Sequence, residues 1–341
     1  MKFNTTIKLT CSLVILLPLF CLAETGDMQI TFKVTDDSGK PIPGVAIGVS
    51  FIQTANPFAP TIGNSHKEQN ELTTGEDGTA FFSKSSILDQ HLYYVIGQIP
   101  GYYYNSGGSY TFQSVSNGHW QPLNPTVEIV KMPIGNQVPM YAKQNDGNLT
   151  LPATDKPIGY DLMAGDWVAP YGKGLTNDFI FTLKRQFTNV NEDFDAMLVV
   201  DFSNEGDGIQ SVSMKPHTSL PLPRSASEDG YASQLALRKY QAAGKPIVVT
   251  SQEAGKPLED ASNEDQNYFF RVRTVKKDGK IISALYGKIY GSMKFSIYRV
   301  STAEIIFTYY LNPEANSRNM EFNSKSNLFK NLKPLEKVTA P

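Results

Sequence analysis

The sequence has 341 residues, a formal net charge of −2 and only two cysteines. A chain of this length is long enough for two ordinary domains that each bury a core. The near-neutral charge and the lack of a long basic run argue against nucleic acid and against an anionic membrane as partners.

The N-terminus has the three regions of a secretory signal peptide. Lys2 and Lys8 make a positive start, "CSLVILLPLFCLA" supplies an apolar run, and Ala23 is a small residue before the polar "ETGD". The apolar run is shorter than the ~20 residues of a membrane-spanning helix. We therefore expect residues 1–23 to be removed on export and the mature protein to begin at Glu24, without a membrane span.

Both cysteines, Cys11 and Cys21, lie within this signal peptide. The mature chain would then form neither a disulfide nor a thiolate metal site, although small secreted domains often depend on disulfides. The cysteine pattern favours an exported protein of a bacterial periplasm or cell exterior.

From Met28 onward the chain reads as short β-strands joined by turns. The stretch "MQITFKVTD" alternates, with Ile30, Phe32 and Val34 on one face. Within "TTGEDGTAFFS" the dipeptide Asp77-Gly78 is a strong hairpin signal. The stretches "HLYYVIGQI" and "TVEIVKM" complete the set. Regularly spaced short strands with turn signals predict an antiparallel sandwich.

Three of these stretches, "VTDDSGKPIPGVAIGVSF", "TTGEDGTAFF" and "YYVIGQIPGYY", resemble the carboxypeptidase regulatory-like family. The resemblance covers residues 27–132 and implies a seven-stranded prealbumin-like or Ig-like β-sandwich. Two polar insertions, "QTANPFAPTIGNSHKEQNE" and "NSGGSYTFQSVSNGHWQPLN", depart from the family pattern. Because the family is in general a non-catalytic accessory fold, the resemblance implies no active site.

Aromatic residues lie in and beside the second insertion, and Tyr103 and Trp120 are the candidates for stacking on a sugar ring. Loops are where binding residues collect. The alternative, which we favour, is that these rings pack the loop onto the edge of the sandwich, because aromatic side chains are first of all large apolar groups.

Residues 133–158 are rich in proline, glycine and asparagine and predict a stiff connector. A second, mainly antiparallel β-domain is expected over residues 159–330, followed by a tail over residues 331–341. Strand alternation is clear in "DFIFTLKRQF" and "DFDAMLVVDF". The stretch "YASQLALRKYQAAGK", with its strong helix formers and closing Gly244, predicts one short helix.

The segment "GYDLMAGDWVAPYGKG", residues 159–174, could be a ligand site or a structural bend. A site would use Trp167 and Tyr171 as a stacking platform, with Asp161 and Asp166 bonding sugar hydroxyls. A bend would use the glycines to turn the backbone and the aspartates to bond nearby N–H groups. We favour the bend, with Trp167 buried at the start of the second domain.

Four aspartates are the catalytic candidates that survive, because no serine-nucleophile motif, phosphate loop or zinc motif occurs. A glycosidase needs two carboxylates ~5–10 Å apart. Asp161 with Asp166, or Asp193 with Asp195, could form such a pair, although acidic residues near turns usually bond the local backbone.

The loop "DFSNEGDG" offers Asp201, Ser203 and Glu205 as oxygen ligands for calcium. The twelfth position of an EF-hand loop should be glutamate, and here it is Val212. A plain hairpin is the favoured interpretation, so no metal and no cofactor are expected.

Three functions remain open. The leading hypothesis is a secreted, non-enzymatic binding or envelope-assembly protein, with a glycan or another envelope protein as partner. The second is a carbohydrate-active enzyme that uses a carboxylate pair of the second domain. The third is a purely structural component of a surface complex.

Overall fold

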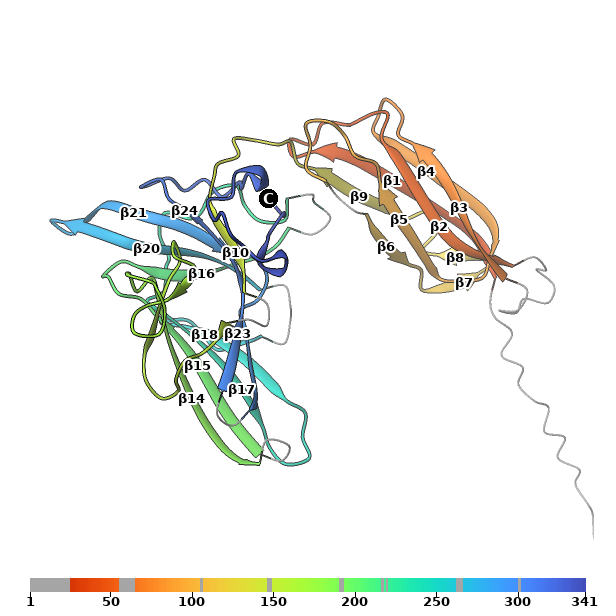
Figure 1. Cartoon of the computed structure of the whole chain (residues 1–341). Helices are drawn as coiled ribbons and strands as arrows, with labels where there is room; N and C mark the ends of the chain where they lie inside the picture. Colours follow the sequence, from red (N-terminus) through yellow and green to blue (C-terminus); the bar gives the residue numbers. More distant parts are fainter. Residues whose placement is uncertain are drawn as a thin grey trace, which may run out of the picture. The chain divides into compact units, whose positions relative to one another are not determined.

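The computed structural model describes residues 25–54, 65–104, 107–145, 149–189, 193–215, 218, 220–261, 266–299 and 302–341. The predicted signal peptide lies outside these residues. The chain divides into two compact units. Unit 1 comprises residues up to Gln98 together with Asn105–Ile129, and unit 2 comprises Ile99–Tyr104 and Val130–Pro341. Both are built from β-strands (Figure 1), as the sequence predicted.

Unit 1 contains nine strands. They are β1 (Gly26–Asp36), β2 (Ala46–Thr54), β3 (Ser65–Thr73), β4 (Thr79–Ile87), β5 (His91–Ile96), β6 (Gly108–Thr111), β7 (Ser114–Ser116), β8 (His119–Gln121) and β9 (Thr126–Lys131). Their order is β6-β5-β2-β4-β1-β8-β7, with β3 beside β2 and β9 beside β1.

The two layers of unit 1 meet through aromatic side chains. β2 pairs with β4 only at Gln53 and Ile87, so the sheet folds over at that corner. The rings of Phe32 and Tyr94 then lie 5.2 Å apart between β1 and β5, and Phe51 contacts Phe82 at the same distance. A β-sandwich is therefore confirmed for this region.

The strands of unit 2 form three sheets. They are β10 (Tyr141–Gln144), β11 (Leu149–Thr150), β12 (Ile158–Asp161), β13 (Asp166–Trp167), β14 (Phe179–Asn189), β15 (Asp193–Asp201), β16 (Gly208–Val212), β17 (Gln234–Gln241), β18 (Val248–Glu253), β19 (Glu259–Asp260), β20 (Asn267–Lys277), β21 (Lys280–Ile289), β22 (Lys294–Arg299), β23 (Thr302–Ile306) and β24 (Thr308–Asn312).

A seven-stranded sheet, β13-β12-β14-β15-β17-β18-β19, packs its inner face against a five-stranded sheet, β10-β24-β21-β20-β16, and a three-stranded sheet, β11-β23-β22. One apolar core joins all three. Phe179 of β14 lies at its centre and contacts the rings of Phe202, Phe270 and Phe307 at 5.1 to 6.2 Å.

The helix predicted around residues 231–245 is wrong, because this segment contains β17. Leu235 and Leu237 point into the core, while Arg238 is exposed. β17 pairs along its whole length with β15 on one side, and its residues Leu235 to Tyr240 pair with the whole of β18 on the other. Helix propensity is a weak preference, and two neighbouring strands that satisfy every backbone group outweigh it. Within the described residues the only helical elements are the 3₁₀ turns Ser324–Ser326 and Pro334–Glu336.

The predicted connector, residues 133–158, also differs from the structure. It contains β10 and β11, which pair with β24 and β23. Met140 and Ala142 are fully buried. The prolines and glycines of this region mark the turns between short strands, and they do not make a tether.

The tail predicted over residues 331–341 runs along unit 2 and is bonded to it. Val338 packs against the cluster that contains Met140 and Phe322. The carbonyl oxygen of Ala340 accepts a hydrogen bond from the Tyr310 hydroxyl at 3.2 Å. No helix among the described residues is long and apolar enough to cross a membrane.

Candidate functional site

The segment 159–174 forms a short hairpin at the edge of the seven-stranded sheet. β12 and β13 pair antiparallel, with Tyr160 opposite Trp167 and Asp161 opposite Asp166. Gly165 closes the turn at φ +64°, a conformation that other residues rarely adopt. The structure therefore brings together the two aspartates that the sequence offered as a first carboxylate pair.

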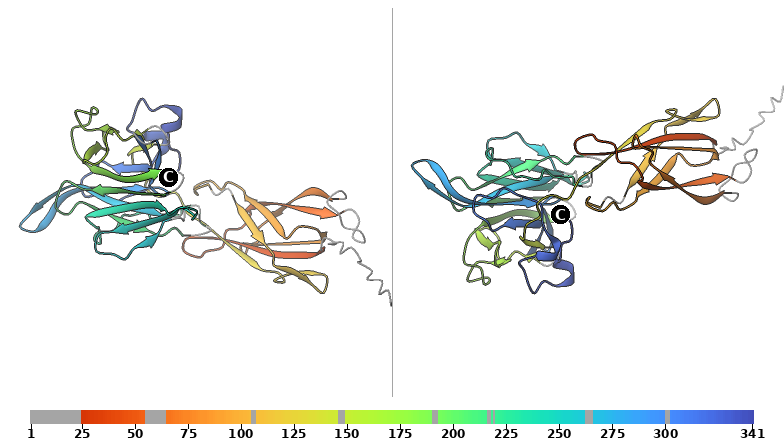
Figure 2. Two further views of the ribbon diagram at one scale, coloured as in Figure 1. Left: turned by 90° about the horizontal axis from the view of Figure 1, so that it is seen from below. Right: turned by 90° about the horizontal axis from the view of Figure 1, so that it is seen from above.

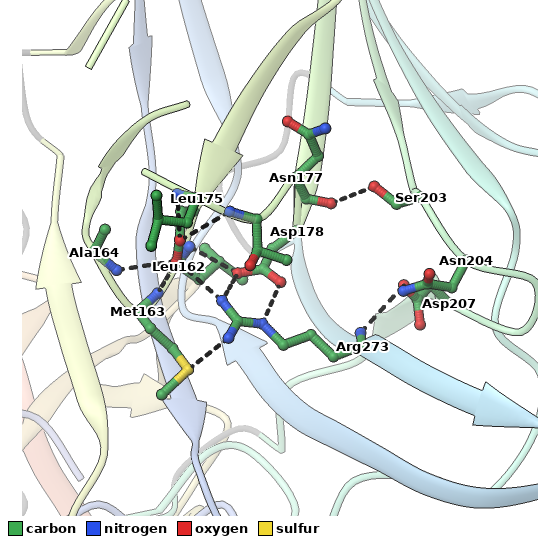
Figure 3. A network of polar contacts seen from close by, with 12 residues as sticks. Leu162, Met163, Ala164, Leu175, Asn177, Asp178, Ser203, Asn204, Asp207 and Arg273 are labelled. Carbon is green, nitrogen blue, oxygen red and sulfur yellow. Dashed lines mark hydrogen bonds and ion pairs between the residues drawn. The ribbon is translucent and has the colours of Figure 1, made fainter. Parts of the chain in front are cut away.

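Asp161 is buried, and its carboxylate accepts hydrogen bonds from the backbone. Its oxygens accept four N–H groups at 2.9 to 3.1 Å, from Met163, Ala164, Leu175 and Thr176. Figure 3 shows this network together with Asp178 and Arg273, which are described next. Asp161 thus holds two separate stretches of the same loop in place, which is the local bonding that the sequence predicted.

A second aspartate, Asp178, completes the network. It is 1% exposed, and it accepts the Leu162 N–H at 2.9 Å. Arg273 of β20 donates to both Asp178 oxygens at 2.8 Å and to Asp161 at 3.0 Å. A bidentate guanidinium contact of this kind is among the strong hydrogen bonds of proteins.

Sequence reasoning missed Asp178 and Arg273. A usable signal was present in "NYFFRVRTV", where Arg271 and Arg273 interrupt an otherwise apolar strand. Charged side chains in a buried strand require partners. The sequence could have predicted that carboxylates lie opposite this strand, but not which ones.

The main chain of Arg273 is unusual too. It adopts φ +55° at a break in the β20–β21 register between Val272 and Val275. Asp207 accepts the N–H groups of Arg273 and Thr274 at 3.2 and 2.8 Å. This β-bulge aims the guanidinium at the two aspartates.

The pKa values of the two acids shift in opposite directions. Burial alone would raise the pKa of Asp161, but the N–H groups and Arg273 outweigh it and hold that pKa below its ordinary value of 3.8. Burial raises the pKa of Asp178, and Arg273 opposes the rise. The paired carboxylates in turn raise the pKa of Arg273. Both acids are acceptors only, so the arrangement is an ion-pair cluster that stabilises the loop.

The other three candidates of the hairpin, Asp166, Trp167 and Tyr171, do not form one site. Asp166 accepts the N–H groups of Trp167 and Lys173 at 2.8 and 2.9 Å. Trp167 is buried, its ring lies 5.3 Å from that of Tyr160, and its indole N–H donates to the Thr150 carbonyl at 3.1 Å. Tyr171 is 41% exposed. Trp167 and Tyr171 therefore do not form one stacking platform.

The possible calcium ligands do not converge. Asp201 accepts a hydrogen bond from Gln234 at 2.7 Å, and the Ser203 hydroxyl donates to the Asn177 carbonyl. Glu205 faces solvent beside Lys276 at 2.6 Å. Within the part of the chain that the structure describes, no group of three His, Cys, Asp or Glu side chains could hold a metal ion.

Tyr103 and Trp120 are both buried. The Tyr103 hydroxyl donates to Glu321 at 2.6 Å, and Glu321 also binds Arg224 at 2.6 Å. The Trp120 indole donates to the Ile87 carbonyl at 3.1 Å. Each ring is an anchor within its own unit, so neither offers a face to a sugar.

The second carboxylate pair lies on β15, away from the hairpin. Asp193 is exposed at the start of the strand. Asp195 accepts two hydrogen bonds from Arg238 of β17, at 2.8 and 2.7 Å, and Arg238 holds the pKa of Asp195 below its ordinary value. Asp195 therefore lacks the raised pKa of a catalytic acid.

Around Asp195 the outer face of the seven-stranded sheet is hollowed. The hollow has a volume of about 290 Å³ and is lined by Lys184, Arg185, Gln186, Asp195, Met197 and Arg238. Lys184, Met197 and Arg238 lie side by side across three strands. Lys184 and Arg238 beside Asp195 make this hollow a candidate binding site, whereas Arg185 is opposite the buried Ala196, so its side chain belongs to the other face of the sheet.

Comparisons with known proteins identify no family. No family model matches the chain, and no curated protein matches it. Chlorocatechol 1,2-dioxygenase from Pseudomonas putida matches 32% of this chain at 12% identity and a TM-score of 0.22, and the match spans only 61% of that enzyme.

Two pilins match more of the chain. The major pilin SpaD from Corynebacterium diphtheriae is 9% identical over 87% of this chain and 84% of its own, with a TM-score of 0.23. The major pilin subunit BcpA from Bacillus cereus is 9% identical over 83% and 95%, with a TM-score of 0.22. At such low scores these similarities support no conclusion about function.

Removing the Trp167 ring should destabilise unit 2. Trp167→Ala deletes a buried aromatic side chain and should cost about 3–5 kcal/mol of unfolding free energy. Tyr171→Ala, in the same loop but exposed, should change it by less than about 0.5 kcal/mol. Urea unfolding followed by circular dichroism measures both. Equal effects of the two substitutions would contradict the structural role of Trp167.

The buried ion pair should matter far more than the exposed one. Arg273→Met leaves two buried carboxylates unpaired and should cost about 3–5 kcal/mol. Arg238→Met removes the partner of the exposed Asp195 and should cost no more than about 1 kcal/mol. The same unfolding experiment measures both losses. An Arg273→Met loss as small as that of Arg238→Met would show that the cluster contributes little to the stability of unit 2.

The Glu321 anchor should give unit 2 an acid-sensitive contribution. Burial alone would raise the pKa of Glu321, but Tyr103, Arg224 and the Gly135 N–H hold it below its ordinary value of 4.5. A group whose pKa is lower in the folded than in the unfolded state stabilises the fold at pH values above its unfolded-state pKa. This stabilisation is lost as the pH falls through the folded-state pKa. Wild type should therefore exceed Glu321→Gln in stability at neutral pH, and the gap should close as the pH falls below about 4.5. A gap that stays constant with pH would contradict this.

Proposed function

We propose that this chain is an exported, non-enzymatic binding protein of the cell envelope, and that the outer face of the seven-stranded sheet binds an acidic glycan. The observation that carries the proposal is the basic hollow around Lys184, Met197 and Arg238. Export rests on the signal-peptide pattern of residues 1–23, and the non-catalytic accessory role rests on the resemblance of residues 27–132.

The chemistry of the hollow suits a sugar acid. Lys184 supplies an ammonium group, and the Arg238 guanidinium lies 4.6 Å from the centre of the Tyr240 ring. Lysine and arginine recognise carboxylates and sulfates, and arginine does so with a planar fork. Met197 between them offers an apolar, adaptable surface to a sugar ring. Because Asp195 already engages Arg238, an acidic ligand would share or replace that contact.

The alternative functions receive less support. A carbohydrate-active enzyme would need a free acid with a raised pKa, whereas Asp161 and Asp195 have lowered ones and Asp178 is bonded to Arg273. A purely structural role gives no reason for a basic hollow. Assembly with other envelope proteins is compatible with glycan binding and belongs to the same proposal.

The probe is polygalacturonate, an acidic polysaccharide, with neutral dextran as its comparison. Affinity electrophoresis of the mature protein should show retardation by polygalacturonate alone, and added salt should weaken it. Lys184→Gln combined with Arg238→Gln should weaken the interaction at least about tenfold, the effect of losing two charged contacts.

Lys245→Gln combined with Lys330→Gln is the matched control, since it removes the same charge from exposed positions elsewhere in unit 2 and should leave the retardation unchanged. Equal retardation of all three proteins would refute the proposed site. Release of new reducing ends from the polysaccharide would instead favour the enzyme.

A further inference from the structure

The hairpin formed by β20 and β21 projects from the body of unit 2 in all three views (Figures 1 and 2). Its turn is Asp278-Gly279, with φ of +51° and +74°, the conformation that a two-residue hairpin of the primed type requires. β16 and β24 pair with the inner parts of the two strands, and those pairings extend only to Arg271 and Tyr286. The outer part of the hairpin therefore extends as a two-stranded arm.

The base of this arm is held firmly. On β20, Asp207 bonds the backbone of Arg273 and Thr274, and the Arg273 side chain is bonded to Asp178. On β21, Asn316 accepts the Ala284 N–H at 3.0 Å and donates to the Ile282 carbonyl at 3.1 Å. An arm rooted on both strands presents its tip in a defined position, which lowers the entropic cost of binding.

The tip combines exposed aliphatic side chains with lysines. Val275, Ile281 and Ile282 are 50%, 37% and 53% exposed. Lys277 and Lys280 pair directly across the end of the arm, with Asp278 as the one acid between them. A soluble protein ordinarily keeps branched aliphatic residues off an exposed two-stranded edge, because they invite aggregation.

The aliphatic residues do not all lie on one face. Val275 is opposite Ser283 and Lys276 is opposite Ile281, and the register shifts between these two pairs. The shift interrupts the regular alternation of side chains, so Val275, Ile281 and Ile282 do not make one flat face. A partner that docks against one flat face would cover only part of this surface. A medium that surrounds the tip would cover all of it.

We propose that the tip of the β20–β21 hairpin inserts end-on into the surface of an anionic lipid bilayer. The aliphatic side chains enter the boundary between headgroups and acyl chains, as the apolar side chains of interfacial segments do. Lys277 and Lys280 extend to the acidic headgroups. The sequence argued against an anionic membrane on its overall charge, but the attraction acts within a Debye length of the tip, so local charge decides it.

The test is co-sedimentation of the mature protein with vesicles of phosphatidylglycerol and phosphatidylcholine, compared with pure phosphatidylcholine vesicles. Wild type should partition at least about tenfold more strongly onto the anionic vesicles, and added salt should reduce the difference. Ile281→Ser combined with Ile282→Ser should lower partitioning on the anionic vesicles at least about tenfold, and so should Lys277→Glu combined with Lys280→Glu.

Leu258→Ser is the control for the aliphatic pair, because Leu258 is 61% exposed elsewhere in unit 2. Lys245→Glu combined with Lys330→Glu is the control for the lysines, because it makes the same charge change at two exposed lysines elsewhere in unit 2, and both controls should sediment like wild type. Urea unfolding midpoints confirm that each variant is folded. Wild type that fails to sediment with anionic vesicles would overturn the inference and leave a protein groove as the partner of the tip. Undiminished sedimentation of the Ile281→Ser, Ile282→Ser variant would overturn it as well.

Discussion

The contact between Arg273 and two aspartates holds unit 2 together at the edge of its core. Arg273 belongs to the five-stranded sheet, whereas Asp161 and Asp178 belong to the seven-stranded sheet and the loop before β14. Desolvating three charges is costly, and the bidentate hydrogen bonds together with five backbone N–H groups offset that cost. A left-handed backbone at Arg273, stabilised by Asp207, is needed to aim the guanidinium.

This constraint decides which surfaces remain available. The acids of the 159–174 hairpin are used to hold the loop, and Trp167 and Tyr160 fill the core behind it. The outer face of the seven-stranded sheet and the β20–β21 arm carry charged side chains outside this cluster, Lys184 and Arg238 on the first and Lys277 and Lys280 on the second. The arm is rooted in the same cluster, since the bulge that places Arg273 also starts the two-stranded part of the hairpin.

The reason for the glycines of residues 159–174 is visible only in the fold. We expected the glycines of residues 159–174 to let the backbone turn sharply, yet Gly159, Gly172 and Gly174 do not have a positive φ. A Cβ at Gly159 would collide with Asn177, and one at Gly172 would collide with the Trp167 carbonyl. These glycines allow close packing of the loop, and Gly165 alone among the glycines of this segment serves a left-handed turn.

Local pattern alone determined the all-β class, most strands and the turns at Asp77-Gly78 and Asp278-Gly279, because alternation and turn chemistry act over a few residues. It failed for β17, where helix formers are held between two strands, and for β10 and β11, whose partners lie more than 150 residues later in the chain. The role of Asp161 as a backbone acceptor was predicted, but its pairing with Arg273 was not. Those two residues are 112 positions apart, and the bulge that joins them depends on Asp207 in yet another loop. Contacts of this kind have no local signal, so only the tertiary structure could decide that Asp161 and Asp178 share one ion pair with Arg273.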